Sequence, residues 1–453
     1  MTRRAVLVTG VVVALALVLG AVGGWLLLRD TTQDCPIPTE AVDDEQAGFV
    51  PRDALVPAGS VGAERAPVIE AAERLPDPFG PVVSGRFYGS EEKVPQLVAL
   101  DPGVVLAEPP SEPGGPATLQ DVSLPGGNPS WTRAFTGGAA SGGPVGPLFV
   151  TAVGGAAPTV LTVDAESGDL VACVAVAATE GSGDVLLLTD QAGPDVVLAA
   201  TRAGSPATLS RVDPEEGSTG WEQTLQEPGE VGALAAGPDQ AVVSRVGRDP
   251  VRLAEMATSG TVDGPTVAAY SLDDGSPTWT YPTPVDPTTA ATALGTDSET
   301  GETYLLEVRA RGRGTTSRVV ALDADGATRW SRDLGRGFWD GSLWDDLLVM
   351  QGPDPRGGAL LRALTRNDGS PVWDLSSRDF PAPRRALQRF GPPATVGDEV
   401  VVTAPGGLAL VDPSTGDATP VRTALRVDQV LPVGDHLVLR AGAALLVLEV
   451  TGD

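Results

Sequence analysis

One short phrase recurs through this chain, and its clearest copy is "VVALDADGATRW", residues 319–330. The phrase joins strand-forming residues, an acidic turn that ends in glycine, and a short segment that runs to tryptophan. Related phrases, 43 to 58 residues apart, place their turn glycines at Gly168, Gly217, Gly275, Gly326, Gly369 and Gly416. A sequence period of roughly 40–50 residues is typical of propellers and related arrays. We therefore expect copies of one structural unit stacked against each other.

The spacing from glycine to tryptophan is constant where the rest of the phrase varies. It is four residues in the pairs Gly217 and Trp221, Gly275 and Trp279, Gly326 and Trp330, and Gly369 and Trp373. Runs of Val and Leu before the turn predict a strand, and the turn aspartate accepts backbone N–H groups. Glycine suits positive φ, which costs other residues about 1–2 kcal/mol. A one-residue slip would move tryptophan to the opposite face, so each phrase predicts a β-hairpin whose register is counted from glycine.

A further strand precedes each hairpin, as in "YLLEVRA" at 304–310, so each unit holds about four short strands. Such units cannot bury both faces alone, and their radial stacking gives an all-β propeller. The chain ends before its last unit has an outgoing strand, so an N-terminal strand should complete that blade. If residues 81–89 do so, there are eight blades, with a weak one around 94–105. If residues 130–137 do so, there are seven. We expect seven, with eight as the alternative.

The N-terminus predicts a membrane anchor. Residues 5–28 carry no charge, and a helix of that length reaches about 36 Å, enough for a hydrocarbon core of about 30 Å. Arg3 and Arg4 stay in the cytoplasm by the positive-inside rule, so residues 1–4 form a cytoplasmic tip. A cleaved signal peptide is the alternative, because small residues occur at 20–24.

The segment after the anchor, residues 29–78, is rich in Pro, Ala and acidic residues. Few of its residues suit a core, so we interpret it as a linker with one short helix near 68–75. The propeller then occupies residues 79–453. Everything after the anchor is expected outside the cytoplasm.

Composition excludes some functions. The formal net charge of −28 repels nucleic acid and anionic lipid. Lys93 is the only lysine among many arginines, which is typical of a GC-rich, actinobacterial genome. Two cysteines, Cys35 and Cys173, fit neither a disulfide-built scaffold nor a zinc motif. Whether they pair, as an oxidising compartment would allow, stays open.

The strand with "ALD", the glycine turn and the tryptophan four residues later resemble the repeats of pyrroloquinoline-quinone-like (quinoprotein-type) β-propellers, over residues 80–453. The resemblance implies that Trp221, Trp279, Trp330 and Trp373 pack between neighbouring blades. That family contains quinone-dependent dehydrogenases, and also non-catalytic scaffolds and membrane-anchored sensor domains. Its alcohol-oxidising members typically carry an adjacent Cys-Cys pair and a calcium or lanthanide site. This chain has no Cys-Cys pair, so we expect no quinone cofactor and no metal.

We assign no residue a catalytic role. The only histidine, His436, heads a predicted strand and has no nucleophile elbow nearby. The turn carboxylates are interpreted as turn caps because the full calcium-loop spacing is missing; they are Asp164, Asp213, Asp273, Asp323, Asp325 and Asp412. A glycosidase that uses two carboxylates is a less favoured interpretation.

Two segments are candidates for contact with a partner. "RARGRGTTSR" at 309–318 is a basic cluster containing Arg309, Arg311 and Arg313, which either grips an anionic partner or is a solvated loop. "GFWDGSLWDD" at 337–346 places Trp339 and Trp344 either in a contact patch or in the first strand of a blade.

These observations favour a single-pass membrane protein whose extracytoplasmic propeller binds a protein or a cell-envelope component. The loops of every blade would form a broad, rigid platform. The alternative is an enzyme on the same fold, either a quinone-dependent oxidoreductase or a glycan-acting hydrolase.

Overall fold

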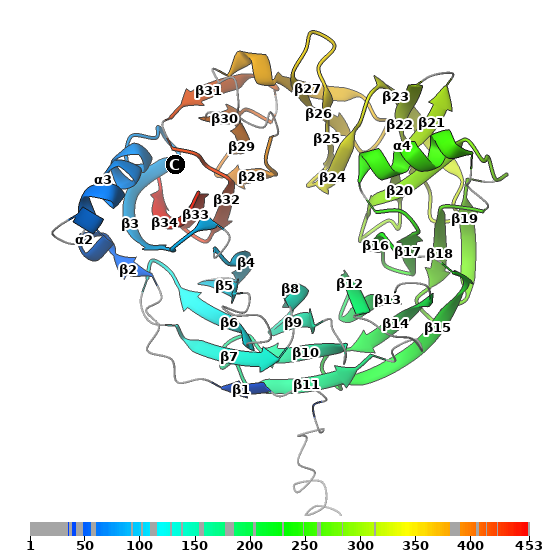
Figure 1. The fold of residues 1–453 in the computed structure, drawn as a ribbon, viewed down its shortest axis with the longest axis horizontal. Coiled ribbons are helices and arrows are strands. Elements are labelled where there is room, and N and C mark those ends of the chain that lie inside the picture. The colour runs from blue at the N-terminus through cyan, green and yellow to red at the C-terminus, as the bar shows by residue number, and fades with distance from the viewer. Residues whose placement is uncertain are drawn as a thin grey trace, which may run out of the picture.

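The protein is a closed ring of eight antiparallel sheets, or blades, around a central axis (Figure 1). Within blades 2 to 7 the chain runs outward from the axis, strand by strand, as a meander. This computed structural model describes residues 35, 39–41, 49–55, 60–91, 94–100, 103–108, 116–126, 129–136, 139–153, 158–176, 185–202, 205–228, 231–247, 249–260, 264–282, 284–311, 314–380, 390–404, 407–413, 415–423 and 425–451.

The first four blades follow the chain from its N-terminal third. Blade 1 holds β4 (Gln96–Leu100), β5 (Gly103–Glu108), β6 (Pro116–Ser123) and β7 (Trp131–Thr136), with β1 (Thr39–Ala41) added outside β7. Blade 2 holds β8 (Ala139–Val145), β9 (Leu148–Val153), β10 (Thr159–Asp164) and β11 (Leu170–Ala175). Blade 3 holds β12 (Val185–Ala192), β13 (Asp195–Arg202), β14 (Pro206–Asp213) and β15 (Ser218–Pro228). Blade 4 holds β16 (Ala233–Ala236), β17 (Gln240–Ser244), β18 (Val267–Ser271) and β19 (Pro277–Tyr281).

The other four blades complete the ring. Blade 5 holds β20 (Thr289–Thr296), β21 (Thr303–Arg311), β22 (Gly314–Leu322) and β23 (Thr328–Arg336). Blade 6 holds β24 (Asp340–Trp344), β25 (Leu347–Pro353), β26 (Ala359–Thr365) and β27 (Pro371–Ser376), followed by η2 (Ser377–Asp379). Blade 7 holds β28 (Pro393–Val396), β29 (Glu399–Ala404), β30 (Gly407–Val411) and β31 (Ala418–Arg422). Blade 8 holds β32 (Gln429–Val433), β33 (His436–Ala441) and β34 (Ala444–Val450), then β3 (Phe79–Phe87) and β2 (Val50–Pro51).

Burial explains which strands are apolar throughout and which alternate. Middle strands such as β9 ("LFVTAV") and β30 ("GLALV") are buried at every residue, because a neighbouring blade covers each face. Outer strands such as β19 are mostly exposed and carry polar residues. In the described residues, eight hydrophobic clusters lie one at each interface between adjacent blades. Lateral packing around the whole ring therefore holds the fold together.

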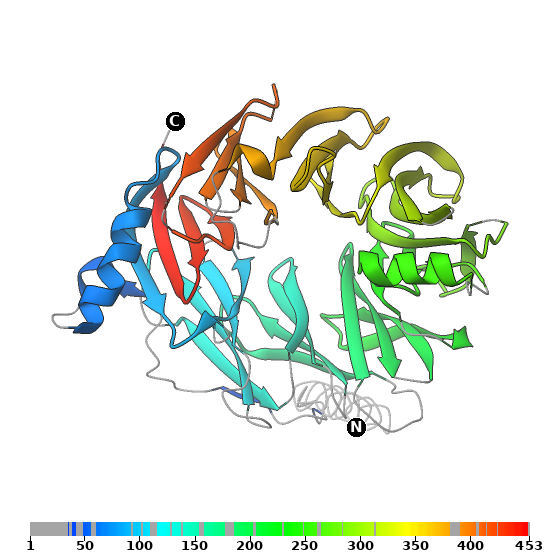
Figure 2. The same cartoon turned by 45° about the horizontal axis from the view of Figure 1, so that its top comes forward.

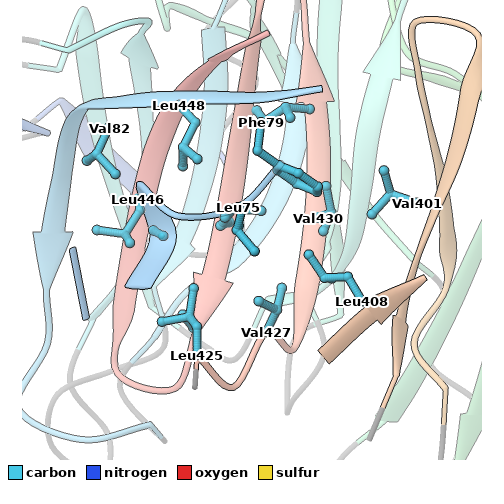
Figure 3. Close-up of a cluster of buried hydrophobic side chains, with 14 of the residues drawn as sticks. Leu75, Phe79, Val82, Val401, Leu408, Leu425, Val427, Val430, Leu446 and Leu448 are labelled. Carbon is cyan, nitrogen blue, oxygen red and sulfur yellow. The ribbon is translucent and has the colours of Figure 1, made fainter. Parts of the chain in front are cut away.

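The ring closes by pairing the start of the propeller with its end. β3 pairs antiparallel with β34, and Ser84 lies opposite Val447. Figure 3 shows Phe79 and Val82 of β3 beside Leu446 and Leu448 of β34 in one buried cluster. The expectation of seven blades is therefore wrong, and the alternative of eight is correct. Residues 81–89 supply the closing strand, whereas residues 130–137 lie largely in β7 of a complete blade 1 that begins near residue 94.

Parts of residues 29–78, interpreted as a linker, form ordered elements on the outer rim. β1 pairs with β7 of blade 1, and β2 pairs with β3 of blade 8. Helices α2 (Arg52–Leu55) and α3 (Ser60–Ala72) bury Leu55 and Ile69 against blades 7 and 8. We call the described residues of 35–78 the belt. It spans four neighbouring blades, from blade 2 through blades 1 and 8 to the edge of blade 7.

A disulfide ties the start of the belt to the ring. Cys35 is bonded to Cys173 on β11, the outer strand of blade 2, with Cα atoms 5.4 Å apart. No helix among the described residues has the length and apolar character needed to cross a bilayer. The predicted anchor, residues 5–28, and the tip, residues 1–4, lie outside the described residues.

The two ends of the ring differ in the connections they carry. The turn end carries the hairpins between first and second strands and the glycine turns between third and fourth strands. The crossover end carries the remaining connections, including those from blade to blade. In blade 4 this end holds α4 (Pro250–Ser259), capped by Asp249, whose side chain accepts from Val251 N, and ended by Gly260 at φ 63°. Both views show α4 lying across blade 5 (Figures 1 and 2), where Leu253 is fully buried.

The glycine turns give the ring an acid sensitivity. Hydrogen bonds from the Ser370 and Thr365 hydroxyls lower the pKa of Asp368 from 3.8 to about 2, and similar bonds lower the pKa of Asp164 and Asp274. A carboxylate with a depressed pKa in the folded state stabilises at pH values above its unfolded pKa, and the effect is lost as pH falls through the folded pKa. We expect the free energy of unfolding to fall between pH 4 and pH 2, and Asp368→Asn to flatten part of that slope in urea titrations followed by circular dichroism. An unchanged slope would contradict this assignment.

Candidate functional site

The repeat tryptophans lie between blades, each against the turn glycine of the next blade. Their indole Nε1 atoms donate to carbonyl oxygens in that turn, Trp221 to Leu272 at 2.6 Å, Trp279 to Ala324 at 3.1 Å, and Trp330 to Arg366 at 3.0 Å. An added Cβ would lie 2.8 Å from the ring at Gly275 and 2.6 Å at Gly326 and Gly369. These glycines have φ between 68° and 80°. Each one sets the register of its own hairpin and receives the indole of the blade before it.

Two more tryptophans complete this series. Trp373 lies against Gly416 and is 4% exposed. Trp131, which the sequence analysis did not assign to the repeat, lies against Gly168 and donates from Nε1 to Ala165 O at 2.9 Å. Gly127 precedes Trp131 by four residues, so the spacing signal was present in the sequence. Gly217 has φ 63°, but the preceding outer strand, β11, contains no tryptophan.

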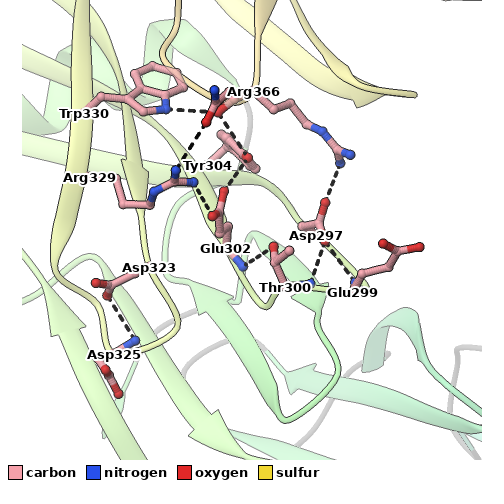
Figure 4. Close-up of polar contacts among 11 residues, drawn as sticks. Asp297, Glu299, Thr300, Glu302, Tyr304, Asp323, Asp325, Arg329, Trp330 and Arg366 are labelled. Atoms are coloured by element: carbon pink, nitrogen blue, oxygen red, sulfur yellow. Dashed lines mark hydrogen bonds and ion pairs between the residues drawn. The ribbon is translucent and has the colours of Figure 1, made fainter.

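Polar contacts reinforce the joint between blades 5 and 6 around Trp330 (Figure 4). Arg366 Nη1 lies 2.8 Å from Asp297 Oδ2, and the Tyr304 hydroxyl donates to Glu302 Oε2 at 2.9 Å. Burial, and then the bond to Glu302, raise the pKa of Tyr304. The phenol therefore remains a neutral donor at physiological pH, and the joint is a structural contact.

The aromatic segment 337–346 contributes to the core. Trp339 is 2% exposed and packs between blades 5 and 6, where the Gly352 backbone leaves room for its ring. Trp344 is half-buried at the end of β24, the first strand of blade 6. Of the two interpretations of this segment, the first strand of a blade describes it better than a contact patch does. The neighbouring Phe338, which we did not predict as a contact, is 50% exposed.

The basic cluster lies beside a pocket at the crossover end of blade 5. Arg309 and Arg311 of β21 line this pocket, which has a volume of about 520 Å³ and is also lined by Arg318, Glu307, Asp286 and Thr288. We call it the arginine pocket. Arg313 lies outside the described residues. The structure thus brings two of the three predicted arginines together with Arg318, which comes from the next strand, β22.

A buried carboxylate organises the arginine pocket. The side chain of Glu307 is 0% exposed, and its Oε1 lies 2.6 Å from Arg318 Nε and 2.7 Å from Arg309 Nε. Its Oε2 accepts from Arg318 Nη2 at 2.8 Å and from the hydroxyl of Tyr281 on blade 4. One carboxylate therefore fixes two guanidinium groups in place, and both blades contribute to the arrangement.

The charge states around Glu307 follow from these contacts. Burial, followed by the Glu307 hydrogen bond, raises the pKa of Tyr281, so the phenol stays protonated and donates. The hydrogen bond to Glu307 raises the pKa of Arg318 further above its usual value. The pocket is thus a rigid set of cationic donors rather than an acid–base pair.

Exposed apolar side chains gather at the same end of the ring. Among the described residues, the large hydrophobic side chains that are strongly exposed are Val251, Val285 and Phe338, at 46%, 46% and 50%. Val251 lies on α4, Val285 between blades 4 and 5, and Phe338 between blades 5 and 6. All three belong to crossover-end connections. Exposed apolar groups around buried or paired arginines are typical of protein-docking surfaces.

The turn end has a different character. Its hairpins and glycine turns carry many carboxylates on the described residues, among them Asp164, Glu166, Asp213, Glu215, Glu216, Asp273, Asp274, Asp323, Asp325, Asp368 and Asp412. Much of the chain's net charge of −28 is therefore displayed here. Acidic turns keep this end solvated and repel anionic surfaces, which leaves the crossover end as the candidate site.

Comparison with known proteins agrees with this architecture. Residues 266–426, which span blades 4 to 7, match the family described as "Outer membrane protein assembly factor BamB". The matched blades carry the repeat of a pyrroloquinoline-quinone-like β-propeller family. No curated protein matches this chain at the level of sequence.

Solved structures share the propeller architecture of this chain. The Dos1 propeller has a TM-score of 0.52 at 10% identity, covering 84% of this chain and 96% of its own. Sqt1 of Saccharomyces cerevisiae has a TM-score of 0.50 at 12% identity, covering 81% and 98%. BamB of Moraxella catarrhalis is 16% identical, with a TM-score of 0.47 over 81% and 99%. Identities this low show the fold alone.

Replacing the central carboxylate of the arginine pocket should destabilise the propeller. Glu307→Gln leaves Arg309 and Arg318 without their buried counter-charge, and we expect the free energy of unfolding to fall by about 2–4 kcal/mol. This expected loss of free energy is smaller than the loss on breaking a fully buried ion pair, because both arginines are partly exposed and water can hydrate them. Glu299→Gln, at an exposed carboxylate of the same blade, is the matched control. Equal urea midpoints for the two variants would refute the organising role of Glu307.

Proposed function

We propose that this protein is a membrane-tethered, extracytoplasmic scaffold that docks a partner protein through the crossover end of blades 4 to 6. The observation that carries the proposal is the gathering of Val251, Val285 and Phe338 at that end, beside the arginine pocket. Apolar side chains that are exposed in the free protein gain free energy when a partner covers them. The family match, described for an assembly factor, is consistent with a binding role.

Two observations support a position outside the cytoplasm. A disulfide joins Cys35 to Cys173, and such bonds form and persist in oxidising compartments and are rare in the cytosol. Residues 5–28 have the length and apolar character of a membrane anchor. Cys35 follows the predicted span by seven residues, which reach at most about 25 Å. The rim of blade 2 would then lie near the bilayer.

Site-specific photo-crosslinking in intact cells tests the docking end. A photo-reactive benzoyl-phenylalanine at the position of Phe338 should give discrete protein adducts, because the side chain lies at the proposed contact. The same probe at Asp325, an exposed turn-end residue of blade 5, is the control and should give none. Equal adduct patterns at both positions, or none at Phe338, would count against docking at the crossover end.

The location is tested separately from the docking. Cys35 and Cys173 should be unreactive to a thiol-specific polyethylene-glycol reagent in rapidly acid-quenched cells, and should both react after reduction. Free thiols in freshly quenched cells would place the head in a reducing compartment and would remove this part of the proposal.

A further inference from the structure

We infer that the arginine pocket receives one carboxylate from an aspartate or glutamate side chain of the docked partner. The inference rests on the proposed function, because it names the group that the crossover end would recognise. It is carried by three arginines that converge on one cavity at the edge of an apolar surface.

The pocket holds donors that the protein does not use. Within the described residues, the side chain of Arg311 makes no hydrogen bond or ion pair, although it lines the cavity. Arg309 uses Nε toward Glu307, while its two terminal nitrogens form no hydrogen bond in the described part of the chain. Arg318 uses Nε and Nη2, which leaves Nη1. Guanidinium groups with free N–H donors bind carboxylates in a planar, charge-assisted geometry.

Glu307 makes the pocket ready for a ligand before one arrives. Because its side chain is fully buried and contacts both Arg309 and Arg318, these two side chains are already ordered. A ligand therefore does not meet the full entropic cost of ordering two long side chains. Glu307 acts as a positioning residue, since its own oxygens are occupied.

The charge of the lining disfavours a dianion, because the formal charges of its arginines and carboxylates sum to zero. Three arginines face three carboxylates, Glu307, Asp286 and Asp333. Glu307 is neutralised by its contacts, but Asp286 and Asp333 remain near the cavity and would repel a second negative charge. A phosphate monoester carries about −1.5 to −2 charges at pH 7, whereas a carboxylate carries one. The pocket is therefore suited to a single carboxylate.

The surroundings of the pocket favour a polypeptide as the source of that carboxylate. Val285 precedes the lining residue Asp286, and it is 46% exposed. Phe338 lies two residues beyond Arg336, which pairs with the lining residue Thr316. A cavity of about 520 Å³ admits a whole acidic side chain with its backbone. The net charge of −28 repels acidic tracts at long range, so we infer an isolated acidic residue within an apolar segment.

Calorimetric titration of the full chain in detergent tests the inference with small probes. N-acetyl-glutamate α-amide carries one side-chain carboxylate, and N-acetyl-glutamine α-amide is its neutral isostere. We expect saturable binding of the glutamate probe and at least tenfold weaker binding of the glutamine probe, because a charge-assisted hydrogen bond contributes about 1.5–3 kcal/mol. Inorganic phosphate is the third probe and should bind more weakly than glutamate.

Two variants locate the binding. Arg311→Gln should weaken the glutamate probe about tenfold without loss of fold, because Arg311 has no partner to lose. Arg422→Gln removes the same charge from an exposed crossover-end residue of blade 7, and should change affinity less than twofold. Equal binding of both amides, tighter binding of phosphate, or an unaffected Arg311→Gln variant would each overturn the inference. If one of these results overturns the inference but the probe at Phe338 still gives protein adducts in cells, the docking proposal remains intact.

Discussion

Replacing Gly326 with alanine should lower the free energy of unfolding by about 2–4 kcal/mol. The new Cβ would lie 2.6 Å from the Trp279 ring, and the backbone at φ 80° already disfavours a side chain. The left-handed conformation costs about 1–2 kcal/mol, and displacing a packed ring adds about 1–3 kcal/mol. Urea denaturation followed by tryptophan fluorescence measures the loss, and the emission should shift to longer wavelength if Trp279 is displaced.

Gly146 offers a matched control for that substitution. It has φ 57°, and an added Cβ there would have nothing within 4 Å. Gly146→Ala should therefore show the backbone cost alone, and the difference between the two variants isolates the contact between blades. If both variants lose the same stability, the glycine is needed only for its own turn, and Trp279 does not depend on the space it leaves.

Removing the disulfide by Cys35→Ser with Cys173→Ser should lower the free energy of unfolding by about 2–5 kcal/mol. The bond joins residues 138 apart, and loops of that length restrict the unfolded chain strongly. The disulfide also lies on an outer strand that lacks the tryptophan contact to the next blade, because β11 contains no tryptophan. We expect the loss to appear as a lower urea midpoint.

Reduction of the wild-type protein provides the comparison. Dithiothreitol should lower the wild-type midpoint to that of the double variant and should leave the double variant unchanged. A reduced wild-type protein with an unaltered midpoint would mean that β1, β2 and the helices hold the belt without the disulfide.

The repeat could be predicted from sequence because its signal is local. Gly326 and Trp330 lie within one hairpin, so a fixed spacing reports their relation directly. The blade count needed information that is not local. β3 pairs with β34 from the far end of the chain, and nothing near residues 79–87 identifies that partner. Blade 1 also lacks an acidic turn before Trp131, so its membership in the repeat was not recognised.

The arginine pocket was only half visible in the sequence. Arg309 and Arg311 stood out as neighbours in a basic run, but Glu307 appeared as part of an apolar strand. The pairing of Arg311 with Gly314 places Glu307 opposite Arg318. Counting residues back from the hairpin would therefore have predicted that Glu307 lies beside Arg318. Tyr281 comes from another blade, and no pattern in one chain segment could reveal that contact. The exposed Phe338 was hidden beside the more conspicuous Trp339.

Closure of the ring between β3 and β34 has a consequence for how the protein is made. The strand that seals the circle is synthesised well before its partner, because β3 precedes the strands β4 to β33 along the chain and β34 follows them. Until then the nascent polypeptide exposes unpaired β-edges, which are templates for association with other chains. Synthesis that outpaces ring closure should therefore yield strand-exchanged dimers, in which β3 of one copy pairs with β34 of its neighbour.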